Sequence, residues 1–146
     1  MSHETTTSKV EVKWVEEDVF VASDGAGHSV VFDSGLSRSN AHPRGIGPMS
    51  NLLASLGACS GMDVAAILLK RKQKLRSLTV EVSGQRPKYG FPKPFTEVRV
   101  LYRVGGGGLD ERYVKEAVTD SMTKFCSVVA TIDKGVKVDY SYALEP

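Results

Sequence analysis

The sequence holds few of the residues on which several large protein classes depend. Two cysteines and three histidines occur among 146 residues, so a disulfide-rich scaffold is excluded, and the histidines show no metal-ligand spacing with the cysteines. Neither sign of charge dominates, because 19 Lys and Arg residues are balanced by 17 Asp and Glu residues, for a formal charge of +2. We therefore expect no large nucleic-acid-binding surface.

The N-terminus lacks the apolar core of a secretory signal, because its first eight residues read MSHETTTS. We expect a cytoplasmic protein with a flexible tail over residues 1–8. The length and the shares of hydrophobic residues (41%) and charged residues (25%) fit one globular domain over residues 1–146. In a reducing compartment, two cysteines are either inert core thiols or a working redox pair.

The most apolar segment contains the first cysteine and predicts a buried central helix. Between residues 52 and 69 only Asp63 carries a formal charge, and apolar residues fall on every side of a 3.6-residue wheel. Pro48 suits a first helical turn, and the basic residues 70–72 suit the negative end of the helix dipole. A membrane span is disfavoured, since small and polar residues interrupt the segment and no aromatic belt flanks it.

The rest of the chain predicts strands on both sides of that helix, and a second helix. Alternating apolar residues predict strands over residues 9–15, 20–23, 29–33, 78–82, 96–104 and 136–142. Residues 24–27 suit a hairpin turn, residues 34–47 a surface loop and residues 105–108, four glycines, a flexible linker. Residues 109–125 predict an amphipathic helix, followed by a short helical turn at 126–130. The order βββ-α-ββ-α-β indicates the α+β fold class.

The two cysteines, Cys59 and Cys126, offer the clearest chemistry. A thiol acts as a nucleophile only as the thiolate, which needs a nearby positive charge or hydrogen-bond donors. Cys59 lies about three turns inside its helix, beyond the reach of that helix's own dipole. The nearest cations in sequence are Arg38 and Arg44, whereas Asp63, one turn away, would raise a thiol pKa. From composition alone, a small buried hydrophobe is the better interpretation of Cys59, because free cysteine is among the most buried residue types.

Two separate motifs resemble those of the OsmC/Ohr family of osmotically inducible and organic hydroperoxide resistance proteins. Residues 47–59 (GPMSNLLASLGAC), followed by 62–64 (MDV), resemble the family's signature helix, and residues 124–128 (KFCSV) its second-cysteine motif. Gly27-His28 and Asp33 are similar to its early hairpin. The resemblance runs from about residue 9 to residue 142, which is almost the whole chain.

The resemblance implies an intertwined homodimer with enclosed central helices, and a thiol peroxidase that acts on organic hydroperoxides in oxidative-stress defence. Cys59 would be the peroxidatic residue and Cys126 the resolving one. The enzyme would pass through a Cys59 sulfenic acid and a Cys59–Cys126 disulfide, with a dithiol such as a lipoylated protein as reductant. The implied mechanism needs no metal and no organic cofactor, and nucleic acid and membrane are not implied as partners.

The sequence departs from the family pattern at two places. Active members carry a glutamate just after the proline that opens the helix and an arginine in the early hairpin, but this chain has Met49 to Asn51 and residues 24–27 (DGAG) there. Arg38 or Arg44 would have to stabilise the thiolate, from the same or the other subunit. A second class of function stays open: a non-catalytic OsmC-like protein that acts as a redox sensor or binds a hydrophobic ligand.

Overall fold

The computed structural model describes residues 3–35 and 42–146. Its helices and strands follow the predicted order. The short helical turn predicted at residues 126–130 is present at Ser127–Thr131, and one further helical segment, Ser121–Phe125, precedes it. The chain divides into two compact units, Met1–Asn51 and Leu52–Pro146, which we describe separately. Residues 3–8 are exposed and have no regular secondary structure. One domain over residues 1–146 stays a prediction.

The N-terminal unit contains a three-stranded antiparallel sheet of β1 (Glu11–Glu16), β2 (Val19–Ser23) and β3 (Ser29–Phe32), in that order. The predicted turn between β2 and β3 is confirmed. The Asp24 carboxylate accepts the Ala26 N–H at 2.7 Å, and Gly25 and Gly27 have φ angles of 80° and 94°, which favour glycine. The predicted loop 34–47 lies partly outside the described residues, and its described end pairs Ile46 with β3.

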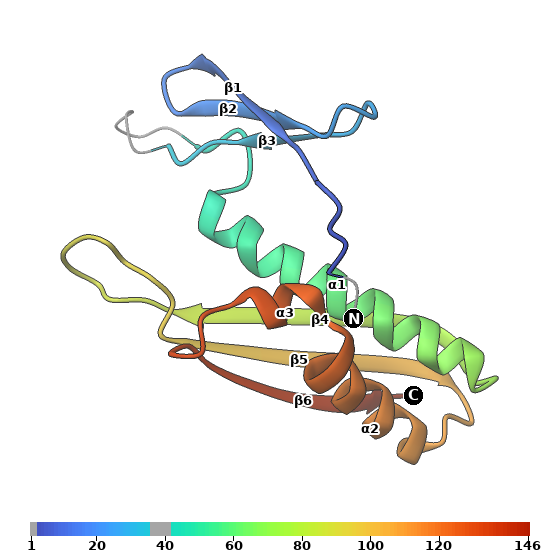
Figure 1. Cartoon of the computed structure of the whole chain (residues 1–146). Coiled ribbons are helices and arrows are strands. Elements are labelled where there is room, and N and C mark those ends of the chain that lie inside the picture. Colours follow the sequence, from blue (N-terminus) through green and yellow to red (C-terminus); the bar gives the residue numbers. More distant parts are fainter. Residues whose placement is uncertain (1–2, 36–41) are drawn as a thin grey trace. The chain divides into compact units, whose positions relative to one another are not determined.

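The C-terminal unit is built on a second three-stranded sheet, with the order β4-β5-β6 (Figure 1). Here β4 (Lys74–Gln85) and β5 (Glu97–Gly107) are antiparallel, and β6 (Lys137–Glu145) runs parallel to β5. A parallel pair needs a crossover connection. The helical segments α2 (Glu111–Asp120), η1 (Ser121–Phe125) and α3 (Ser127–Thr131) form it.

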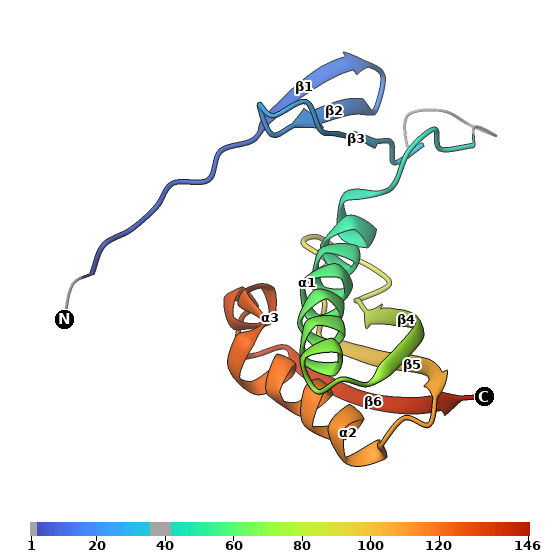
Figure 2. The same ribbon diagram turned by 90° about the vertical axis from the view of Figure 1, so that its right-hand side faces the viewer.

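The core of this unit lies between the sheet and two helices, α1 (Pro48–Lys70) and α2 (Figure 2). The inward residues of β5 alternate along the strand, as a half-buried strand requires. The fully buried members of the core are Leu56, Val64, Leu68, Val98, Val100, Tyr102, Val104, Val114, Ala117 and Val118. On the opposite face of the sheet, Arg103 forms ion pairs with Glu81 at 2.6 Å and Glu145 at 3.2 Å.

The predicted central helix is present, and in the single chain it is buried along one face. Leu56, Val64 and Leu68 are fully buried, and α1 begins at Pro48 and ends at Lys70 as the sequence indicates. Other apolar side chains of α1 remain exposed: Leu52 by 45%, Met62 by 71% and Leu69 by 59%. Among the described residues, α1 is the one helix long and apolar enough to cross a membrane, but its buried side chains belong to a protein core.

The four glycines 105–108 are a correction to the sequence analysis. They were expected to end the strand as a flexible linker, whereas β5 continues to Gly107. A Cβ at Gly106 would overlap the backbone oxygen of Lys74, and one at Gly105 the Ser77 hydroxyl. These glycines face an irregularity in β4 between Leu75 and Ser77. Gly105 and Gly106 are needed because β4 leaves no room for a side chain at these two positions.

Candidate active site

The two cysteines come together in the C-terminal unit. Cys59 lies in α1 and is partly exposed, whereas Cys126 lies between η1 and α3 and is only 4% exposed. Both are free thiols, and they lie close enough together for Cys59 to raise the pKa of the Cys126 thiol. The structure thus joins two residues that the sequence could connect only through a family resemblance.

The surroundings of Cys126 favour its protonated form. Burial is the largest influence and raises the pKa of this thiol, because a thiolate is poorly solvated there. The N–H groups of Val129 and Val128 in α3 stabilise the thiolate and lower the pKa, while the contact with Cys59 raises it again. The net shift is upward. Cys126 is therefore suited to donate its proton to the Cys59 sulfur.

The segment before Cys126 has an unusual backbone. The sequence predicts one helix over residues 109–125, but α2 ends at Asp120 and residues 121–125 form the π-helical turn η1. Such turns are rare and are often found at functional sites. Here the turn closes with the Cys126 N–H donating to the Ser121 carbonyl at 2.8 Å. The geometry of η1 therefore fixes the position of the Cys126 backbone.

A chain of buried hydroxyl groups lies beside the cysteines, and sequence reasoning did not select it. The Ser60 hydroxyl hydrogen-bonds to the Tyr102 hydroxyl and, at 2.7 Å, to the Ser121 hydroxyl. Ser121 in turn donates to the Asp63 carboxylate at 2.9 Å. Ser60, Tyr102 and Ser121 are fully buried. The available signals were a serine directly after Cys59 and a tyrosine among the inward valines of β5.

The Tyr102 hydroxyl stays neutral in this environment. Burial is the main cause and raises the pKa of Tyr102 to about 12, while the hydrogen bond with Ser60 lowers it. The negative charges that Cys126 and Asp63 carry when ionised raise it further. Tyr102 is therefore a hydrogen-bond donor at physiological pH, close to both groups.

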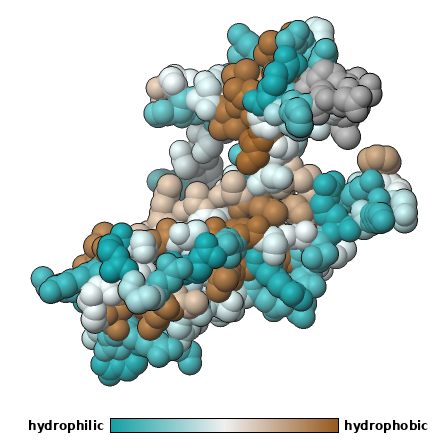
Figure 3. Space-filling view, turned by 180° about the vertical axis from the view of Figure 1, so that it is seen from behind, coloured by the Kyte–Doolittle hydropathy of each residue, from teal (hydrophilic) through white to brown (hydrophobic). Residues whose placement is uncertain are grey.

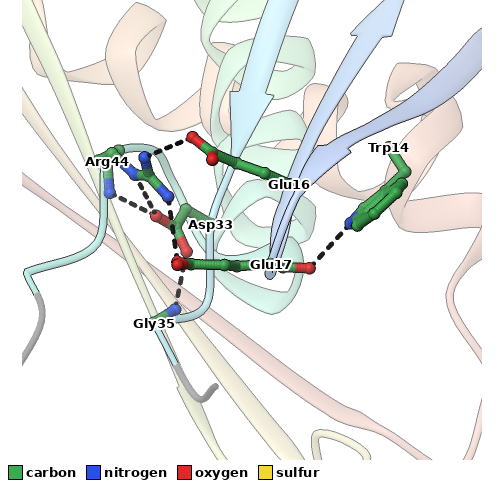
Figure 4. Close-up of polar contacts among 6 residues, drawn as sticks. All are labelled: Trp14, Glu16, Glu17, Asp33, Gly35 and Arg44. Carbon is green, nitrogen blue, oxygen red and sulfur yellow. Dashed lines mark hydrogen bonds and ion pairs between the residues drawn. The ribbon is translucent and has the colours of Figure 1, made fainter. Parts of the chain in front are cut away.

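Of the two arginines proposed to stabilise the thiolate, the structure describes only Arg44. Arg38 lies outside the described residues. Arg44 lies in the N-terminal unit, where three carboxylates hold it (Figure 4). The Arg44 guanidinium pairs with Glu16 at 3.0 Å, Glu17 at 3.4 Å and Asp33 at 3.4 Å. The backbone N–H of Arg44 also donates to the Asp33 carboxylate at 2.9 Å. Asp33 is buried, whereas the Arg44 side chain is 48% exposed.

The described part of the chain contains no cluster of three or more His, Cys, Asp or Glu side chains that could hold a metal ion. The chemistry that this arrangement itself offers is sulfur chemistry. It consists of one partly exposed thiol, a second, buried thiol close to it, and a hydroxyl network beside them.

Comparison with known proteins gives a consistent result. The model of the OsmC-like protein family matches residues 41–141. Protein YhfA of Escherichia coli K12 is 32% identical over 131 residues, which cover 90% of this chain and 93% of YhfA.

Solved structures share the fold. An OsmC-like protein from Mycoplasma pneumoniae superposes with a TM-score of 0.81 at 16% identity, over 97% of this chain and 99% of that one. An organic hydroperoxide resistance protein from Legionella pneumophila gives a TM-score of 0.65 at 14% identity, over 96% and 98% of the two chains. With the family model and YhfA, these findings establish that the chain belongs to the OsmC-like protein family.

Proposed function

We propose that this OsmC-like protein is a cytoplasmic, thiol-dependent peroxidase that reduces organic hydroperoxides in oxidative-stress defence. The observation that carries the proposal is the contact between a partly exposed thiol, Cys59, and a buried thiol, Cys126. A peroxide can reach the first, and the second is in place to react with the product. The name of the Legionella relative, an organic hydroperoxide resistance protein, supports the substrate class.

In the first step, the Cys59 thiolate attacks the terminal oxygen of the hydroperoxide. A sulfur–oxygen bond forms, the O–O bond breaks, and the alkoxide takes a proton and leaves as the alcohol. Cys59 is then a sulfenic acid. In the second step the Cys126 thiolate attacks the Cys59 sulfur, the S–S bond forms, and hydroxide leaves and is protonated to water. A dithiol, such as a lipoylated protein, reduces the disulfide by exchange and is itself oxidised to a disulfide.

The direct test mixes reduced protein with one equivalent of cumene hydroperoxide and measures free thiols, followed by peroxide consumption with excess dihydrolipoamide. The proposal predicts loss of both thiols per chain and many turnovers. Oxidation of the thiols without turnover would instead favour a redox sensor. Unchanged thiols would rule out both redox functions and leave the binding of a hydrophobic ligand.

The second step should depend on pH in a direction that the environment of Cys126 determines. Because burial raises the pKa of this thiol, only a small fraction is thiolate at neutral pH. We expect the rate of disulfide closure to increase about tenfold per pH unit from pH 7 upward until the pKa of Cys126 is passed. Stopped-flow fluorescence after a single peroxide equivalent measures it. A rate that is level between pH 7 and 8.5 would show that Cys126 is already ionised.

Arg38 and Arg44 remain the two candidates for the positive charge that stabilises the Cys59 thiolate. An arginine held by carboxylates is a suitable group, because its orientation is fixed and its remaining N–H donors can bind a leaving oxygen. Arg44 has that character, with Asp33 as its buried partner. Changing each arginine to glutamine in the peroxide assay identifies which of the two acts.

We further propose that the protein is a homodimer. The exposed apolar residues of α1 support a dimer. The exposed apolar residues of the N-terminal sheet support it as well, and Figure 3 shows apolar surface on this sheet. Large exposed apolar patches on a soluble protein mark interaction surfaces. The large exposed side chains of the N-terminal sheet, with those of the residues before it, are Val10, Val12, Trp14, Val15, Phe20, Val30 and Val31. Sedimentation equilibrium should give twice the chain mass of 15.8 kDa.

A further inference from the structure

The hydroxyl chain beside the cysteines has a defined direction. Each hydroxyl has a single proton, and Ser121 donates its proton to Asp63. Ser60 must then donate to Ser121, which leaves its own oxygen to accept from Tyr102. Every donor in the series is used, and the series ends on a carboxylate, which makes the strongest hydrogen bonds of this kind.

This series of hydrogen-bonded hydroxyl groups connects the backbone segments that carry the two thiols. Ser60 is the neighbour of Cys59 on α1. Ser121 is bound to α1 through its hydroxyl, and its carbonyl accepts the Cys126 N–H at 2.8 Å. Tyr102 adds an anchor on β5, the central strand of the sheet. Two hydrogen bonds therefore lead from the residue beside one cysteine to the backbone of the other.

Such a connection matters because a disulfide tolerates little error in the separation and orientation of its cysteines. Cys126 follows a π-helical turn that continues α2, and Ser121, the first residue of the turn, donates its N–H to carbonyls of α2. Two buried hydrogen bonds, from the Ser121 hydroxyl to Ser60 and to Asp63, tie the first residue of that turn to α1.

We infer that Tyr102, Ser60, Ser121 and Asp63 form a positioning network that holds Cys126 against Cys59 and thereby controls how readily the disulfide forms. The network acts on the second thiol and leaves the reaction of Cys59 with peroxide unaffected. The kinetic part of the inference rests on the proposed peroxidase function; the equilibrium part does not.

The equilibrium test uses glutathione disulfide and needs no peroxide. The Cys59 thiolate attacks glutathione disulfide and releases one glutathione, and Cys126 then attacks the mixed disulfide and releases the second. The ratio of oxidised to reduced protein in a series of glutathione buffers gives the effective concentration of the thiol pair. We expect Tyr102→Phe and Ser121→Ala each to lower that concentration at least tenfold, because displacements near 1 Å cost about that much or more.

Two control variants separate positioning from general stability. Tyr142→Phe removes the same oxygen from a tyrosine on β6 whose hydroxyl donates to Glu111 at 3.0 Å. Val114→Ala removes buried methyl groups from α2 and destabilises the fold without touching the network. Both should keep the wild-type effective concentration while the protein is folded. An equal decrease in Val114→Ala, or no decrease in either network variant, would overturn the inference.

A kinetic experiment uses stopped flow to follow the reaction of the reduced protein with one equivalent of hydroperoxide. In the network variants, formation of the Cys59 sulfenic acid should keep its wild-type rate, while disulfide closure slows about 10- to 100-fold. A wild-type protein that forms the disulfide with glutathione but ignores peroxide would refute the peroxidase and leave the equilibrium test of the network valid. A wild-type protein that forms no disulfide in any glutathione buffer would refute the network.

Discussion

Replacing Cys59 with serine is expected to reduce hydroperoxide consumption by at least about 10³-fold, since it removes the only group proposed to attack the peroxide. Serine occupies nearly the same volume, so the packing of α1 on the sheet should be kept. The hydroxyl is almost never ionised near neutral pH and cannot replace the thiolate. Coupled consumption of cumene hydroperoxide and dihydrolipoamide measures the loss, and circular dichroism checks the fold.

Cys126→Ser is the matched variant, and it should fail at a different step. The first oxidation proceeds, but no thiol is left to close the disulfide, so the Cys59 sulfenic acid persists and can be captured by dimedone. Mass spectrometry should find the adduct on the peptide that contains Cys59. An adduct on Cys126 in the Cys59→Ser protein, with none in the Cys126→Ser protein, would reverse the two roles.

Gly106→Ala should cause the largest loss of stability among single glycine changes in β5. The added Cβ would overlap the backbone oxygen of Lys74 and also approach Leu109 at 3.1 Å. Backbone of the paired strand cannot rotate away as a side chain can. We expect the free energy of unfolding to fall by about 3 kcal/mol, and the melting temperature by roughly 10 °C.

The neighbouring residue provides the control. A Cβ at Gly107 would meet no atom within 4 Å, so Gly107→Ala should change the free energy of unfolding by no more than about 0.5 kcal/mol. Urea denaturation of both variants gives the comparison. Equal stabilities would show that the end of β4 moves freely to admit a side chain.

The sequence was sufficient to predict the order of the elements, because each depends on a local period. Alternating apolar residues located β4, β5 and β6, and Pro48 and Lys70 marked the ends of α1. The glycine run was misread, since composition does not distinguish a glycine needed for flexibility from one needed because a Cβ would collide. That distinction depends on Lys74, which lies far away in the sequence.

The candidate site could be predicted only in part. The cysteines were found through two motifs, but their contact depends on η1, and a five-residue turn is too short for its period to be separated from that of an α-helix. Alternation predicted the inward direction of Tyr102. It carried no information on its partners Ser60 and Ser121, because hydrogen bonds between distant segments leave no periodic trace.

The placement of both thiols within one compact unit has a consequence for the unfolded chain. A bond between Cys59 and Cys126 would close a long loop that includes β4, β5 and α2. Closing a loop of this size restricts the denatured ensemble, and the chain-entropy model gives a stabilisation of about 4 kcal/mol. The oxidised protein would thus resist unfolding more than the reduced one, so resistance to heat would itself record exposure to an oxidant.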